Sequence, residues 1–367
     1  MSGRVIIVGA GIIGMFCALR LQQRGAHVIV LEGESEDQLG AFCPMATLAA
    51  AGMLAPVSEA SGPPERHALL DRLALDSFDL WRSQSKGALW EDGLRFDGGI
   101  FIAANEFEAA DMQQQAARLG RSAKPMPAAQ VCKRTGLNAR VDHALFVEDE
   151  GVADPVRVLS GLVMDARRHG VQVLFGHDVD QVEANKVTVH GKGAFEADTV
   201  LLAPGVWASA QMLQVAPVLK QVRPARGHVV PIKLAQPLKP NVHGQSFYFA
   251  PRLGDDVVLG STMEFDRFDR GVDPDRVQQL LAAAELMFPG EVQLRPNASP
   301  WVGVRPMSPD WGPIIGKSGD VLVACGHSRN GWLLAPVTAE IICGIVFGET
   351  LTPHWAAFQP DRFGISA

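Results

Sequence analysis

The chain of 367 residues is longer than one ordinary hydrophobic core can accommodate, which predicts about two domains. Hydrophobic residues make up 47% and charged residues 20% of the chain, a composition that is typical of a globular protein and excludes a disordered one. The net charge of −7 comes without a basic stripe, so we expect no nucleic-acid partner.

The cysteines and the apolar runs further restrict the kind of protein and the compartment that we expect. The five cysteines show neither a CxxC nor a CxH spacing, and this favours free thiols in a reducing cytoplasm over a disulfide framework or a metal site. No run reaches the roughly 18 apolar residues of a membrane span, so no transmembrane segment is expected. The first apolar run is interpreted as a strand, because a signal-peptide cleavage site is lacking.

The first 32 residues predict a strand, a glycine turn, a helix and a second strand, over residues 5–8, 9–14, 15–24 and 27–31. Gly9 permits the tight turn, Gly11 lets a pyrophosphate approach the backbone, and Gly14 lets helix and strand pack closely. The start of the helix offers N–H groups and a positive dipole end to the phosphates, and Glu32 is placed to bind a ribose hydroxyl. The pattern predicts a bound adenine dinucleotide and leaves open a nicotinamide or a flavin. The structural alternative is a turn that only packs a helix on a sheet.

Periodicity predicts the following elements. Apolar residues at helical intervals predict helices over 65–86, 155–169 and 333–347. Strands over 94–97 and 100–103, separated by two glycines, are expected to form a hairpin. Further strands are expected over 171–175, 186–190, 195–202 and 321–327. Alternating strands over 228–232, 246–250 and 257–261 predict a half-exposed antiparallel sheet.

These elements predict an α/β protein in which a Rossmann-like dinucleotide domain is combined with a second, α+β domain built on a mainly antiparallel sheet. The dinucleotide domain is expected to be discontinuous, with residues 1–85, 145–217 and 298–367. The second, substrate-binding domain is expected to comprise residues 86–144 and 218–297.

Short motifs occur in order along the rest of the chain: AAAGMLAP (49–56), LAPGVWA (202–208), YFAPR (248–252), GSTM (260–263), GVRP (303–306), SPD (308–310), PIIG (313–316) and GHSRNGWLLAP (326–336). Together they resemble the D-amino-acid oxidase family of flavoproteins, most closely its glycine oxidase branch. The resemblance implies a glutathione-reductase-type FAD-binding domain and a homo-oligomer. It also implies non-covalent FAD, because VRPM (304–307) occupies the stretch where related sarcosine oxidases carry a tethering cysteine.

The resemblance also assigns site residues. It implies that Arg305 and Tyr248 hold a substrate carboxylate, that Arg329 touches cofactor and substrate, and that Met53 and Met263 line the pocket. From the residues alone, Arg305 is more typical of a solvated surface arginine, and Tyr248 and the methionines are more typical of core. The implied FAD-binding residues are Gly9, Gly11, Ile12, Ile13, Gly14, Glu32, Gly33, Ala46, Thr47, Ala51, Gly52, Met53, Val179, Gly205, Gly326, His327, Ser328, Arg329, Asn330, Gly331, Trp332 and Leu333.

Two positions depart from the family pattern. Leu48 stands where a small hydroxyl residue is common, which predicts the loss of one contact to the flavin phosphates or ribose. Trp332 replaces a smaller aliphatic residue directly after Gly331, which predicts a differently shaped flavin edge or substrate entry. Both departures weaken the case for glycine itself as the substrate.

The function that the resemblance implies is FAD-dependent oxidative deamination of a small amino acid, such as glycine, sarcosine or a small D-amino acid. Hydride transfer to flavin N5 would give an imino acid, which water hydrolyses to an oxo acid and ammonia, or to an aldehyde acid and a free amine for N-alkyl glycines. Oxygen would be the electron acceptor and hydrogen peroxide the product. Three alternatives stay open at this point. They are an FAD-dependent dehydrogenase that uses another electron carrier, a flavin subunit of a multi-subunit complex, and a nicotinamide dehydrogenase.

Overall fold

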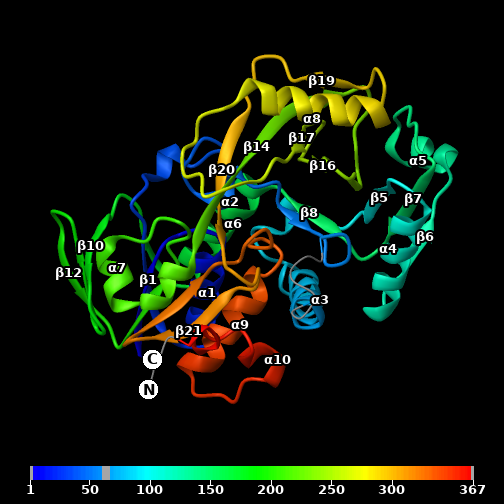
Figure 1. Cartoon of the computed structure of the whole chain (residues 1–367). Helices are drawn as coiled ribbons and strands as arrows, with labels where there is room; N and C mark the ends of the chain where they lie inside the picture. The colour runs from blue at the N-terminus through cyan, green and yellow to red at the C-terminus, as the bar shows by residue number, and fades with distance from the viewer. Residues whose placement is uncertain (1–2, 60–66, 365–367) are drawn as a thin grey trace.

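The computed structural model describes residues 3–59 and 67–364 and contains two large sheets (Figure 1). The first sheet has six strands in the order β21-β22-β13-β1-β2-β9, all parallel except the edge strand β21. Its strands are β1 (Arg4–Val8), β2 (His27–Leu31), β9 (Gln172–Leu174), β13 (Thr199–Leu202), β21 (Ile314–Ser318) and β22 (Val321–Cys325). This topology confirms the predicted Rossmann-like fold.

Four helices pack together beside this sheet: α1 (Ile12–Gln23), α3 (His67–Gln84), α6 (Pro155–Arg168) and α9 (Ala335–Val346). Helix α1 is apolar on almost every side because α6 and α9 flank it. Its Phe16 ring meets Trp81 and Trp90 edge to face at 4.8 and 5.3 Å between centroids. A small antiparallel sheet of β10 (Val179–Val182), β11 (Lys186–Val189) and β12 (Gly193–Glu196) projects from this region.

The second sheet is almost entirely antiparallel, with only β15 and β5 parallel to each other. Its strands are β5 (Gly99–Ala103), β6 (Ala123–Pro125), β7 (His143–Val147), β14 (Arg223–Leu234), β15 (Asn241–His243), β16 (Tyr248–Pro251), β17 (Val257–Gly260), β18 (Glu264–Phe265), β19 (Val292–Leu294) and β20 (Trp301–Met307). The prediction of a half-exposed sheet is wrong at its centre, because residues 225–232 of β14 are all buried. Helix α8 (Pro274–Met287) contacts β14 and β17.

The predicted hairpin over 94–103 is also wrong. Strand β4 (Leu94–Arg95) pairs with β8 (Gly151–Ala153), which also pairs with β3 (Met53–Leu54), whereas β5 pairs with β7 and β15. Gly98, just before β5, and Gly99, its first residue, leave room for neighbouring side chains instead of forming a tight turn. A Cβ on Gly99 would lie 2.0 Å from the carboxylate of the buried Glu150, and one on Gly98 would lie 2.5 Å from the Phe146 ring.

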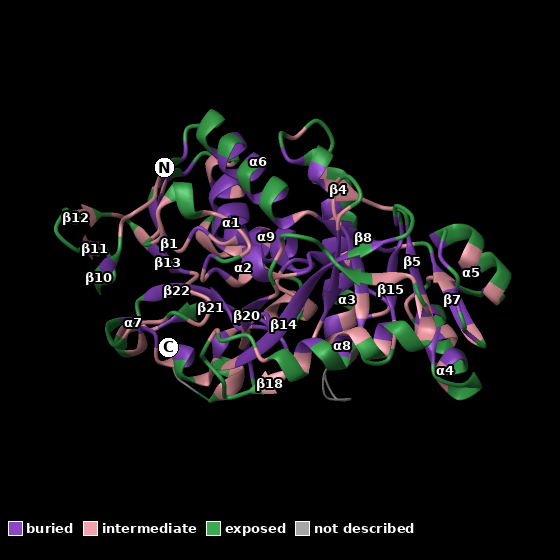
Figure 2. Cartoon of the chain, turned by 90° about the horizontal axis from the view of Figure 1, so that it is seen from above, coloured by how far each residue is buried: buried purple, intermediate pink, exposed green. Residues whose placement is uncertain are grey.

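The two sheets meet where β20, which pairs with β14, leads into β21. The domain boundary at residue 298 stays a prediction, although β20 directly after it belongs to the second sheet. Figure 2 shows buried residues from α9 and β22 through β20 and β14, with exposed residues on the outer helices. The remaining helices are α2 (Ala46–Ala49), α4 (Glu106–Arg118), α5 (Ala128–Thr135), α7 (Ala210–Val215) and α10 (Pro353–Ala356).

Candidate functional site

A cavity of about 500 Å³ lies between the carboxyl ends of β1 and β2 and the strands β14 and β20. A volume of this size lies within the range of small-molecule and cofactor sites. Every site residue predicted from the sequence lines it except Gly14, Met263, Gly326, Asn330 and Leu333. The cavity therefore joins the predicted dinucleotide turn and the predicted substrate residues in one site.

The glycine turn after β1 leaves no room for side chains. Gly9 has φ +107°, and a Cβ there would lie 2.4 Å from the Ala203 carbonyl oxygen. A Cβ on Gly14 would lie 2.0 Å from the Gly9 carbonyl oxygen, so Gly14 packs helix against turn and does not itself reach the cavity. Gly11 is the N-cap of α1 and lines the cavity, with no side chain between backbone and ligand. This cradle fits a pyrophosphate.

Glu32 at the end of β2 is held in place by main-chain donors. Its Oε2 accepts a hydrogen bond from the Ala10 N–H at 2.8 Å, and its Oε1 accepts one from the Glu34 N–H at 3.1 Å. Burial raises the pKa of the Glu32 carboxyl, and these two hydrogen bonds oppose that shift. The carboxylate lines the cavity 21 residues beyond Gly11, where a ribose hydroxyl of a dinucleotide could donate to it.

A hydroxyl group from another helix accepts a hydrogen bond from the start of α1. Thr47 of α2 accepts a hydrogen bond from the Ile12 N–H through Oγ1 at 2.9 Å. The N–H of Ile13, which also lines the cavity, has no partner within the helix. This N–H and the helix dipole favour a phosphate at this end of the cavity. Leu48 is buried and does not line the cavity.

A half-buried arginine, Arg252, holds the small-residue loop before β3. Arg252 donates from Nη2 to the Ala50 carbonyl at 2.9 Å and from Nη1 to the carbonyls of Ala51 at 2.5 Å and Ala153 at 3.2 Å. Gly52 has φ +73°, and a Cβ there would lie 2.1 Å from the same Ala153 oxygen. The loop therefore presents only small side chains and Met53 to the cavity.

The turn after β22 forms the opposite wall. His327 is buried, and its Nε2 lies 2.9 Å from Thr338 Oγ1, which itself donates to the Leu334 carbonyl. His327 therefore carries its proton on Nε2, and burial lowers its pKa to about 3, so it is neutral. The ring of Trp332 stacks on Trp81 with 6.0 Å between centroids.

Arg305 and Tyr248 lie on neighbouring parts of the second sheet and face the cavity together. Arg305 Nη2 donates to Ser261 Oγ at 2.7 Å, and Ser261 also contacts the Tyr248 phenol. A Cβ on Gly260 would lie 2.3 Å from the Tyr248 hydroxyl, so this glycine makes room for the ring. Burial raises the pKa of the Tyr248 phenol and lowers that of the Arg305 guanidinium. The pair offers a cation and an O–H donor to an anion.

A second arginine and a carboxylate complete this end of the cavity. Arg329 Nη2 lies 3.4 Å from Oε1 of Glu59, which is 8% exposed. Both residues line the cavity with Arg305 and Tyr248. The site residues that sequence reasoning missed here are Glu59 and Ser261. Ser261 belongs to the GSTM motif, but neither residue type marks a contact with Arg305 or Arg329, and only the fold reveals these contacts.

Five predicted residues lie outside the cavity lining, and the structure shows a local role for Gly14 and for Leu333, whose carbonyl accepts a hydrogen bond from Ser77 Oγ at 2.6 Å. Gly14 packs the helix, as described above. Asn330 has a buried Oδ1 without a hydrogen-bond partner among the described residues, so it retains an unused acceptor. Met263 lies in the segment that leads from β17 to β18 and is half-buried outside the cavity.

The comparisons with known proteins agree with this geometry. Residues 4–345 match the model of the DAO family, described as FAD dependent oxidoreductase. The chain belongs to this family. It is 32% identical over 98% of its length to the bifunctional protein ThiO/ThiG of Synechocystis, of which it covers 54%. It is 28% identical over 97% of its length to the glycine oxidase of Bacillus licheniformis, of which it covers 96%.

Solved structures of other proteins have the same fold as this chain over nearly its whole length. The glycine oxidase from Geobacillus kaustophilus superimposes with a TM-score of 0.81 at 25% identity, over 99% of both chains. The chain spans about half the length of the bifunctional relatives and nearly all of the length of the glycine oxidases. The family is FAD-dependent, so FAD is the dinucleotide cofactor of this chain. None of the helices in the described ranges is long and apolar enough to cross a membrane.

Proposed function

We propose that this FAD-dependent enzyme oxidises a small amino acid with a free carboxylate to an imino acid, which water hydrolyses to an oxo acid and ammonia, or to an oxo acid and a free amine where the substrate nitrogen is alkylated. Oxygen is the electron acceptor and hydrogen peroxide the product. The observation that carries the proposal is the pairing of Arg305 and Tyr248 in one cavity with the FAD cradle. The similarity to glycine oxidases supports the same chemistry.

The carboxylate would lie against the Arg305 guanidinium and the Tyr248 hydroxyl. A guanidinium binds a carboxylate through two parallel hydrogen bonds, and the reduced solvation of this half-buried arginine strengthens them. Because the carboxylate is fixed at one end, the Cα–H of a short substrate is aimed at the part of the cavity between the loop at Met53 and the turn at Gly331.

FAD, when bound, supplies the two-electron oxidation of the carbon–nitrogen bond. The protein's own part is binding, orientation and exclusion of water. His327 is neutral and bonded to Thr338, so it is not arranged as a general base. An amine that binds in its neutral form needs none, and the loop of Ala50, Ala51 and Gly52 keeps the approach free of bulky side chains.

A peroxide-coupled screen tests the proposal. The FAD-loaded protein would be assayed with glycine, sarcosine, small D-amino acids and cyclic imino acids, in parallel with an Arg305→Leu variant. We expect peroxide from at least one of these compounds and its loss in the variant. If Arg305→Leu retains full turnover on every acidic substrate, the proposed carboxylate site is wrong. If air fails to reoxidise the reduced protein, oxygen is not the acceptor.

The attachment of FAD, the assembly and the compartment belong to the same proposal. The segment around Arg305 has no cysteine at a position where a tether could form, so acid precipitation should release all FAD.

The five cysteines are free thiols, which supports a reducing cytoplasm. A homo-oligomer is what the family resemblance implies, and light scattering of the purified protein would measure it.

A further inference from the structure

The segment 261–273, which connects β17 to α8, contacts the Arg305 guanidinium. Besides the contact with Ser261, Arg305 Nη1 donates to the Thr262 carbonyl at 3.3 Å. Gly227 of β14 leaves space for the guanidinium, since a Cβ there would lie 2.3 Å from Nη1 and 2.5 Å from the Thr262 oxygen. A shift of the Thr262 main chain would therefore shift the guanidinium.

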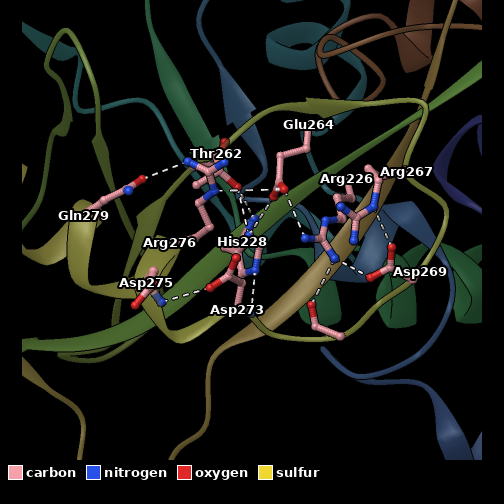
Figure 3. A network of polar contacts seen from close by, with 12 residues as sticks. Arg226, His228, Thr262, Glu264, Arg267, Asp269, Asp273, Asp275, Arg276 and Gln279 are labelled. Atoms are coloured by element: carbon pink, nitrogen blue, oxygen red, sulfur yellow. Dashed lines mark hydrogen bonds and ion pairs between the residues drawn. The ribbon is translucent and has the colours of Figure 1, made fainter.

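His228, the next residue on β14, holds Thr262 through two hydrogen bonds. Its main-chain N–H and its ring Nδ1 reach Thr262 Oγ1 at 3.0 and 2.9 Å (Figure 3). Because side chains alternate along a strand, Gly227 faces the cavity while Arg226 and His228 face the segment. The His228 ring is completely buried and does not line the cavity.

The contact of the second ring nitrogen, Nε2, shows which nitrogen of His228 carries the proton. The main-chain N–H of Asp273 reaches His228 Nε2 at 2.9 Å, and a main-chain N–H can only donate. Nε2 is therefore unprotonated, and Nδ1 carries the proton that it donates to Thr262. Burial lowers the pKa of His228, although Glu264 opposes this shift, which agrees with a neutral ring. One imidazole thus joins the beginning of the segment to its end.

We propose that His228 is a positioning residue that acts through Thr262 to hold the Arg305 guanidinium in its carboxylate-binding orientation, a role that rests on the function proposed above. The rest of the segment has its own anchors. Arg226 pairs with Glu264 at 3.0 Å and with Asp269, and Asp269 pairs with Arg267 (Figure 3). Loss of the His228 contact would therefore leave the segment attached and change the Thr262–Arg305 contact.

The test uses the FAD-loaded protein and acetate as a carboxylate probe, with binding measured from the change in flavin absorbance. Thr262→Val removes the hydroxyl and keeps the shape, and we expect it to weaken acetate binding by about tenfold. Thr262→Ser restores the hydroxyl and should return acetate binding to within about twofold of wild type. The dissociation constant of FAD, measured on the same proteins, should stay within about twofold, which general damage to the site would not allow.

His228→Leu removes both ring contacts and should weaken acetate binding by about as much as Thr262→Val. The double variant should be no worse than either single one, because the two residues act in series. Asp266→Asn is the control on the same segment, because Asp266 is exposed and lies 3.8 Å from the equally exposed Arg223, and it should bind acetate like wild type. If Arg305→Leu abolishes acetate binding while the Thr262 and His228 variants bind normally, this inference is overturned and the proposed function stands. If Arg305→Leu binds acetate normally, the proposed function fails.

Discussion

The indole of Trp332 donates from Nε1 to the main-chain oxygen of Thr47 at 3.0 Å, across 285 residues of sequence. Thr47 in turn accepts the Ile12 N–H at the start of α1. The turn after β22 therefore fixes the residue that satisfies the first N–H of α1. Trp332 thus links two separate parts of the proposed FAD site.

Trp332→Phe should weaken FAD binding and leave the fold in place. The phenyl ring can still stack on Trp81, and the main-chain carbonyl of residue 332 still accepts from Trp81 Nε1. Only the hydrogen bond to Thr47 is lost, which predicts an increase of up to about tenfold in the dissociation constant of FAD. Titration by flavin fluorescence measures it. Trp355→Phe, which removes an indole contact to Asp76 outside the cavity, is the control and should bind FAD normally.

Tyr248→Phe should raise KM for the amino-acid substrate by about tenfold and change kcat little, since one hydrogen bond to a charged group is lost. The ring itself stays packed over Gly260. Steady-state kinetics with the best substrate from the peroxide screen measure both constants. An unchanged KM would remove the phenol from carboxylate binding.

Much of this site follows from local patterns in the sequence, because the glycine turn places Gly9, Gly11 and Glu32 by backbone geometry alone. Arg305 and Tyr248 required the family resemblance, since an isolated arginine or tyrosine on a strand carries no local signal. Glu59 and His228 were not predicted. Their roles depend on pairing between strands and segments distant in sequence, which no periodicity within one segment encodes. The hairpin over 94–103 failed for the same reason, because Gly99 makes room for Glu150 from another segment.

Glu59→Gln should lower KM for acidic substrates. Glu59 carries a negative charge near the place of the substrate carboxylate, and it pairs with Arg329 at 3.4 Å. Removal of the Glu59 charge frees Arg329 and reduces the repulsion of the substrate carboxylate. For a partly exposed pair we expect KM to fall modestly, by about threefold. Steady-state kinetics decide the direction. A rise in KM would instead assign Glu59 to binding the substrate amine.

The free energy of unfolding should decrease as the pH is lowered below the ordinary pKa of histidine. Burial lowers the pKa of His327 from 6.5 to about 3, so below pH 6.5 the unfolded chain takes up a proton that the folded protein refuses. The contribution of His327 is complete above that pH and is lost toward about pH 3, with a slope of at most about 1.4 kcal/mol per pH unit. Urea unfolding between pH 6.5 and 5 measures it. His327→Gln should reduce this slope by up to about 1.4 kcal/mol per pH unit, which corresponds to one proton. An equal slope in both proteins would contradict the prediction.

Gly14→Ala should destabilise the protein although alanine is the better helix former. The added Cβ would lie 2.0 Å from the Gly9 carbonyl oxygen, and this atom belongs to a backbone turn that cannot move aside without displacing the cradle. Overpacking of this kind costs about 2 kcal/mol, more than the roughly 1 kcal/mol that helix propensity returns. We expect a lower urea midpoint together with weaker FAD binding. Gly40→Ala, where a Cβ meets no atom within 4 Å, is the matched control and should leave both quantities unchanged. A Gly14→Ala protein as stable as wild type would show that the turn and helix can separate, and the close packing of this glycine would then not be what shapes the phosphate site.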